Sequence, residues 1–166
     1  MHIVLVNPEI PQNTGNIART CAATGTALHL IHPMGFSVDE RQVRRAGLDY
    51  WPLLELREHI SLEAFFEAIP RDRCVFLSTK AAKCYSDMVY EPDSVLVFGC
   101  ETRGLPESLL KANYERCFRI PMLPRLRSLN LANSVAIVLY EALRQTGFEG
   151  MERRGALSAC NLPENS

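Results

Sequence analysis

Short apolar runs alternate along the chain with longer segments in which apolar residues recur every three or four positions. The short runs predict buried strands, and the longer segments predict amphipathic helices. The predicted strands cover 2–7, 27–32, 51–56, 74–79, 95–99 and 117–120, and the predicted helices cover 14–24, 38–46, 61–69, 106–112 and 129–146. This alternation indicates an α/β fold with a mostly parallel sheet flanked by helices.

Polar residues and glycines mark several helix ends. Thr14 is predicted to cap the first helix, which Gly25 closes, and Ser61 is predicted to cap the helix that follows. The last helix is the longest, and either Ser128 or Asn130 can cap it. Its broad apolar face suits a central core helix and a dimer interface equally well.

The chain has 166 residues, which predicts one domain over 1–150 with a short polar tail at 151–166. Its 47% hydrophobic and 22% charged residues are ordinary for a globular protein. A net charge of −1 argues against a uniformly basic nucleic-acid binder but permits a local basic patch. The first residues enter a strand pattern without a charged leader, and no apolar run is long enough for a membrane span, so a cytoplasmic location is expected.

The cysteine and histidine patterns give no support for a metal centre. The six cysteines include no C-x-x-C pair and no zinc spacing, which favours free thiols in a reducing compartment. His29 and His32 are three positions apart on a predicted strand and would face opposite sides of the sheet. No metal is therefore expected, and both histidines are interpreted as core or edge residues.

Three segments rich in Gly, Asn and Pro each follow a predicted strand. They are NPEIPQNTGNIAR at 7–19, FGCETRGLP at 98–106 and IPMLPRLRSLNL at 120–131. Such composition is typical of loops that bring bare backbone close to a ligand. Open α/β sheets bind their ligands at the ends of neighbouring strands, so the three segments predict one small-molecule site.

In order and spacing, these segments resemble the three motifs of the SPOUT class of S-adenosylmethionine-dependent RNA methyltransferases, within it the small branch of tRNA (cytidine(34)-2'-O)-methyltransferases. The resemblance extends from the first strand to about Gly150. It implies a C-terminal trefoil knot, S-adenosylmethionine as cofactor, and a homodimer whose sites are built from both chains. It also implies 2'-O-methylation of the wobble nucleotide of tRNA, cytidine or modified uridine at position 34, in leucine tRNAs.

The resemblance assigns roles to individual residues. Arg19 matches the arginine that the class places at the site of methyl transfer, and the expected catalytic set is Arg19, Asn13, Asn16 and Tyr140. The residues expected to bind the cofactor are Leu77, Gly99, Glu101, Gly104, Ile120, Met122, Ser128, Leu129 and Asn130. Those expected to bind the RNA substrate are Arg44, Arg45, Arg103 and Arg127. The chain departs from the class pattern at Leu126, where a serine is common, and at Cys100.

Structural interpretations of the same residues stay open. Arg19 could be a surface arginine, Tyr140 a packing aromatic, Glu101 a carboxylate that fixes its loop, and Arg44 part of a solvated helix face. The alternative functions are 2'-O-methylation of another tRNA position or of ribosomal RNA, and non-catalytic RNA binding on the same fold. The presence of Arg19 together with Asn16 and Asn130 argues against the non-catalytic alternative.

Overall fold

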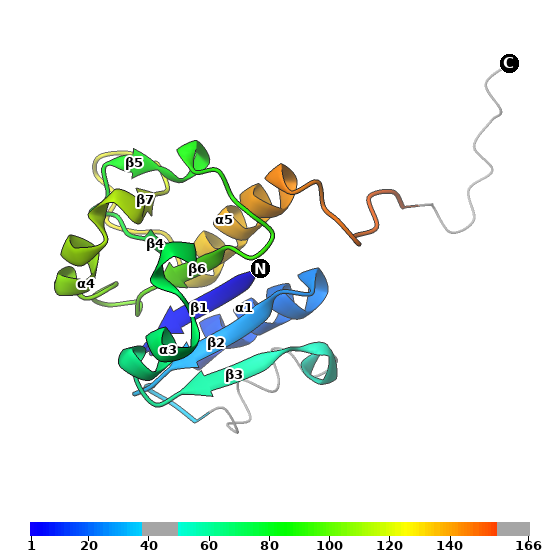
Figure 1. Ribbon diagram of the computed structural model, residues 1–166, viewed down its shortest axis with the longest axis horizontal. Helices are drawn as coiled ribbons and strands as arrows, with labels where there is room; N and C mark the ends of the chain where they lie inside the picture. Colours follow the sequence, from blue (N-terminus) through cyan, green and yellow to red (C-terminus); the bar gives the residue numbers. More distant parts are fainter. Residues whose placement is uncertain (38–49, 156–166) are drawn as a thin grey trace, which may run out of the picture.

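Parallel strands form a single sheet in the order β3-β2-β1-β6-β4-β7-β5 (Figure 1). The computed structural model describes residues 1–37 and 50–155. In this part of the chain the strands are β1 (His2–Val6), β2 (Ala27–Ile31), β3 (Leu56–His59), β4 (Cys74–Leu77), β5 (Lys83–Cys84), β6 (Val95–Phe98) and β7 (Cys117–Arg119). The α-helices are α1 (Pro11–Thr24), α3 (Leu62–Ala68), α4 (Glu107–Ala112) and α5 (Leu131–Gln145). The predicted α/β class is confirmed, and the trefoil knot stays a prediction.

Helices cover both faces of the sheet, which gives three layers. Alternate residues of β1 point to opposite faces, so Ile3 and Leu5 pack with α1 and α5, whereas Val4 and Val6 pack with α3 and α4. The strands β4 and β6 divide in the same way. Strands buried on both faces explain why these segments are continuous apolar runs in the sequence.

Two sequence-based boundaries are wrong. Helix α1 begins at Pro11, and Thr14 lies buried inside it instead of capping it. The first residue of a helix donates no intrahelical hydrogen bond, so a proline, which lacks the N–H group, can start the helix. The segment predicted as a strand at 51–56 instead forms the 3-10 helix η1 (Trp51–Leu53), and β3 starts only at Leu56. The short strand β5 was not predicted.

Other predicted helix ends are confirmed. The hydroxyl of Ser61 accepts a hydrogen bond from the amide of Ala64, and Gly25 closes α1 with a φ of 63°. Of the two candidate caps for α5, the structure uses Asn130, whose side chain accepts hydrogen bonds from the first amides of the helix. The helix predicted at 38–46 lies outside the described residues, as does most of the predicted tail, 156–166.

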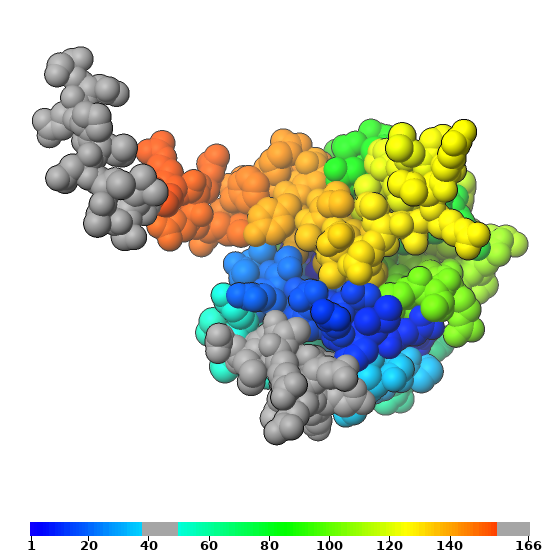
Figure 2. Space-filling view, turned by 180° about the vertical axis from the view of Figure 1, so that it is seen from behind, coloured from blue at the N-terminus to red at the C-terminus, as the bar shows by residue number. Residues whose placement is uncertain are grey.

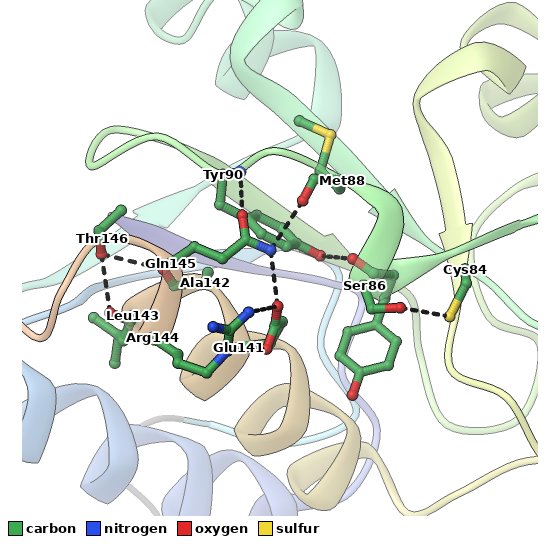
Figure 3. A network of polar contacts seen from close by, with 11 residues as sticks. Cys84, Ser86, Met88, Tyr90, Glu141, Ala142, Leu143, Arg144, Gln145 and Thr146 are labelled. Atoms are coloured by element: carbon green, nitrogen blue, oxygen red, sulfur yellow. Dashed lines mark hydrogen bonds and ion pairs between the residues drawn. The ribbon is translucent and has the colours of Figure 1, made fainter.

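The last turn of α5 is fastened to the segment that precedes β6 (Figure 3). The side chain of Gln145 accepts a hydrogen bond from the amide of Tyr90 at 3.0 Å and donates one to the carbonyl of Met88 at 3.1 Å. The same amide group donates to Glu141, which also accepts from Arg144. These bonds, led by those from Arg144, lower the pKa of Glu141 to about 2. The network fixes the orientation of the helix that borders the candidate site.

The described cysteines are free, and four of them are buried: Cys21, Cys74, Cys100 and Cys117. Burial raises the pKa of the Cys21 thiol to about 12, so it behaves as a small apolar residue. Over residues 1–37 and 50–155, no group of three or more His, Cys, Asp or Glu side chains is arranged to hold a metal ion. Within the same ranges, no helix has the length and apolarity needed to cross a membrane.

A row of three histidines crosses β1, β2 and β3. His29 is fully buried, with one ring nitrogen 3.0 Å from His2 and the other 2.9 Å from His59. Phe65 of α3 packs edge-on against His29. Burial, followed by the influence of the neighbouring His2 and His59, lowers the pKa of His29 to about 3. Burial lowers the pKa values of His2 and His59 as well.

We expect the free energy of unfolding to fall as the pH is lowered from 7.5 to 5.5. The unfolded chain protonates these histidines near pH 6.5, whereas the folded chain resists protonation because their pKa values are lowered. The unfolded state therefore binds more protons, and stability present above pH 6.5 is lost on acidification. For each histidine that stays neutral in the folded chain, the free energy of unfolding falls by about 1.4 kcal/mol per pH unit below this value. Urea unfolding at a series of pH values measures the loss.

A His29→Leu variant provides the control for this pH dependence. It removes the histidine with the most strongly lowered pKa, so its stability should decline less between pH 7.5 and 5.5 than that of the unmodified chain. An equal decline in both proteins would assign the acid sensitivity to other groups.

Candidate functional site

A cavity of about 520 Å³ opens where β4, β6 and β7 end. Leu77 ends β4, Gly99 follows β6 and Ile120 follows β7, and all three residues line the cavity. The ends of parallel strands share one edge of the sheet, so the loops that follow them converge there. In Figure 2, the yellow 120–130 segment lies on the same face as the yellow-green 100–112 segment and the blue first loop.

The cavity gathers every residue that the sequence assigned to cofactor binding. Its lining includes Leu77, Gly99, Glu101, Gly104, Ile120, Met122, Ser128, Leu129 and Asn130. Asn13 from the expected catalytic set lines it too, together with Arg103 and Arg127 from the expected substrate set. Arg44 and Arg45 lie outside the described residues. The three loops thus meet at one site, as predicted.

Gly99 is required by the backbone of its own loop. A Cβ atom at this position would lie 2.0 Å from the carbonyl carbon of Gly104 and 2.1 Å from the nitrogen of Leu105. The loop closes tightly because the amide of Gly104 donates to the carbonyl of Cys100 at 2.9 Å. The sequence predicted that this glycine makes room for a ligand, but the close neighbour is the chain itself.

Glu101 joins the second loop to the start of α1. Its carboxylate accepts hydrogen bonds from the amide of Glu9 at 2.9 Å, from the amide of Ile10 at 3.3 Å, and from the side chain of Asn13 at 2.9 Å. The interpretation of Glu101 as a loop-fixing carboxylate is confirmed, although the loop that it holds is the first one and not its own. The backbone amides just before the start of α1 are therefore already bonded to a carboxylate of the chain.

Two further contacts complete a network between the three motifs. The carboxylate of Glu9 accepts hydrogen bonds from the hydroxyl of Thr102 at 2.9 Å and from its amide at 3.1 Å, and these bonds lower the pKa of Glu9. The side chain of Asn130 donates to Asn13 at 3.0 Å. Asn13 thus connects Glu101 of the second motif with Asn130 of the third. We call this network the motif bridge, and its five residues are Glu9, Asn13, Glu101, Thr102 and Asn130.

Arg19 lies away from the cavity. It is exposed on α1, eight residues after Pro11, which corresponds to about 12 Å along the helix axis. Arg19 lies further along the helix than the predicted start at residue 14 implied, because the helix begins at Pro11. Asn16 is also exposed on α1, and Tyr140 is 46% exposed on α5. Neither residue lines the cavity.

The sequence profile of the SpoU rRNA methylase family matches residues 1–140. The chain belongs to this family. SpoU membership confirms the SPOUT resemblance drawn from the three segments. Among the relatives of this SpoU family member is the tRNA (cytidine(34)-2'-O)-methyltransferase of Escherichia coli K12, which is 50% identical over 151 residues, covering 90% of this chain and 96% of the relative. The enzyme of the same name from Aeromonas hydrophila is 47% identical, with 90% and 97% covered.

Solved structures resemble this SpoU family member over most of its length. One that concerns 2-OH methylation of C/U34 on tRNA superimposes with a TM-score of 0.83 at 48% identity, covering 87% of this chain and 95% of that chain. An rRNA methyltransferase from Sinorhizobium meliloti, solved with AdoMet bound, gives a TM-score of 0.75 at 28% identity, covering 86% of this chain and 55% of that chain.

Sequence reasoning missed part of the lining in this SpoU family member. Ser78, Thr79 and Lys80 follow β4 and border the cavity. Lys80 adds a positive charge at its edge and lies 3.5 Å from Glu107. These residues were missed because the stretch lacks the Gly, Asn and Pro content that marked the other loops. Their position directly after an apolar strand could have indicated that they border the site. Ser134, on the first turn of α5, was missed as well.

Proposed function

We propose that this chain is an S-adenosylmethionine-dependent methyltransferase that modifies the ribose 2'-hydroxyl of the wobble nucleotide of tRNA. Its substrate would be cytidine or modified uridine at position 34 of leucine tRNAs. The observation that carries the proposal is the cavity at the ends of β4, β6 and β7, which is lined by all nine residues assigned to the cofactor. Relatives of about half identity that bear this enzyme's name support the choice of substrate.

The residues at the cavity fit S-adenosylmethionine. A volume of about 520 Å³ lies in the range of small-molecule sites. Leu77, Ile120 and Leu129 offer apolar surface for a flat base, and the backbone of 99–104 and 120–130 offers hydrogen-bonding groups around it. The cofactor supplies a methyl group on a sulfonium, whose departure leaves a neutral thioether. The chain has to orient the ribose and stabilise its oxygen.

Arg19 is proposed to act on the RNA by its charge. A guanidinium is a poor base at neutral pH, so it is not suited to remove the hydroxyl proton. It is well suited to bind a phosphate through two parallel hydrogen bonds or to stabilise negative charge on the 2' oxygen. Water or an RNA phosphate would then accept the proton. Arg103 and Arg127 border the cavity and are proposed to bind the RNA backbone.

A homodimer would bring Arg19 to a site. Arg19 does not line the cavity of its own chain, so we propose that it serves the cavity of a second copy. Helices α1 and α5 pack side by side, and α5 leaves Tyr140 and Ile137 partly exposed. An exposed apolar group on this pair of helices supports a dimer contact there.

We propose that the tRNA reaction takes place in the cytoplasm.

The test is transfer of labelled methyl from S-adenosylmethionine to leucine tRNA transcripts and to native bulk tRNA, with the product nucleotide identified by mass spectrometry. We expect the label as a 2'-O-methylated nucleotide at position 34. A leucine tRNA with a 2'-deoxy nucleotide at this position is the matched control, because it lacks only the acceptor oxygen.

Each other outcome would point elsewhere. Label in ribosomal RNA, or at another tRNA position, would move the substrate and keep the reaction. Cofactor binding without transfer to any RNA would contradict the proposed substrate class. Absence of cofactor binding would favour non-catalytic RNA binding on the same fold.

A further inference from the structure

Arg19 is stacked on an aromatic ring. Its guanidinium carbon lies 4.8 Å from the centre of the Tyr50 ring, and one terminal nitrogen lies 3.4 Å from the tyrosine hydroxyl. This hydrogen bond is long, so the face of the ring makes the main contact. Among the described residues, no carboxylate forms an ion pair with Arg19.

A neutral aromatic partner suits an arginine that has to bind RNA. A carboxylate would orient the guanidinium but would also neutralise its charge and occupy its N–H donors. A ring face takes up one flat side of the group and leaves the in-plane N–H donors directed outward. Arg19 is therefore oriented while its charge and its hydrogen-bonding edge stay available.

Tyr50 is itself held in place. It directly precedes the 3-10 helix η1, and its carbonyl accepts a hydrogen bond from the amide of Leu53 at 3.0 Å. Pro52 stiffens this turn, and Trp51 packs against the core under α1. The ring is thus presented to α1 from a short segment tied to the core at one end and to β3 at the other.

We propose that Tyr50 is a positioning residue for methyl transfer, which acts by orienting the Arg19 guanidinium toward the RNA. The inference rests on the proposed function, in which Arg19 contacts the substrate. An exposed arginine samples many rotamers, and only a few of them direct its N–H edge to one phosphate or ribose oxygen. Stacking on Tyr50 selects orientations before the RNA binds, which raises the rate without adding a contact to the substrate.

The test compares variants that keep the ring with variants that remove it. Tyr50→Phe and Tyr50→Trp should keep most of the turnover rate, because the ring face makes the contact. Tyr50→Leu and Tyr50→Gln should lower kcat about tenfold to a hundredfold, as expected for a misplaced catalytic group. The Kd for S-adenosylmethionine should be unchanged in all four. Tyr114→Leu is the control, since Tyr114 is another surface tyrosine beside a 3-10 helix turn and does not line the cavity.

A double substitution separates positioning from a general structural effect. In an Arg19→Lys background, the planar group that stacks on the ring is lost. Tyr50→Leu should therefore lower kcat by a clearly smaller factor in this background than in the unmodified chain. An equal loss in both backgrounds would overturn the inference, as would ring-free variants that match or exceed the unmodified enzyme. An unmodified chain that transfers no methyl to tRNA would instead refute the proposed function.

Discussion

An Arg19→Ala protein is expected to bind S-adenosylmethionine with unchanged affinity and to lose methyl transfer to tRNA. The loss should be about a hundredfold to a thousandfold, the range found when one group that stabilises transition-state charge is removed. Affinity should persist because Arg19 does not line the cavity. Calorimetric titration with the cofactor and a single-turnover methylation assay measure the two quantities. A parallel collapse of cofactor affinity would show that the arginine serves the pocket instead.

Mixing two inactive proteins tests whether Arg19 acts across a dimer. A heterodimer of Arg19→Ala with a Gly99→Ala chain would pair an intact cavity with an intact arginine at one of its two sites. After random exchange in a twofold-symmetric dimer, activity should recover to about a quarter of the unmodified level. No recovery, in a mixture shown to exchange subunits, would place Arg19 at the cavity of its own chain.

Gly99→Ala should nearly abolish cofactor binding. The new methyl group would lie 2.0 Å from the backbone of Gly104, and backbone atoms cannot yield as a flexible side chain can. Opening the loop to admit the methyl group costs on the order of 3 kcal/mol, which corresponds to about a hundredfold in affinity. Titration calorimetry measures the loss, and circular dichroism checks that the fold is kept.

Gly155→Ala provides the neutral comparison for this experiment. No atom lies within 4 Å of a Cβ built at Gly155, so this substitution should change neither affinity nor stability. If Gly99→Ala binds the cofactor as well as Gly155→Ala does, the closed form of the 99–104 loop is not needed for binding.

The main features of the fold could be predicted because strands buried on both faces leave a simple mark in the sequence. Helices cover both sides of the sheet, so every residue of strands such as 74–77 and 95–98 is apolar, without the alternation of apolar and polar residues seen in half-exposed strands. The ends of helices that depend on hydrogen bonds to distant parts of the chain were harder to predict from the sequence. Thr14 resembled a cap because threonine often is one, whereas α1 starts at Pro11, and the residues before it are held by the carboxylate of Glu101, 91 residues after Ile10.

The residues that the resemblance assigned to the cofactor all line one cavity, because they lie at or after strand ends that share one edge of the sheet, and their binding of the cofactor stays a prediction. The motif bridge could not, because its contacts join residues that local patterns do not relate. Asn13 bonds to Asn130, 117 positions away, and Glu9 bonds to Thr102, 93 positions away. The distance of Arg19 from the cavity also depended on where α1 begins. The partnership of Arg19 with Tyr50 followed from the placement of η1 beside α1, in a segment predicted to be a strand.

The lining of the cavity begins at Ile10 and ends at Ser134, so almost the whole domain is needed to form it. A chain still emerging from the ribosome without α5 has an incomplete pocket, because Leu131 and Ser134 of the lining are missing. The cofactor can thus recognise only chains whose folding is finished, and by mass action it would favour that state. A shortage of S-adenosylmethionine in the cell would therefore shorten the lifetime of the protein as well as slow its reaction.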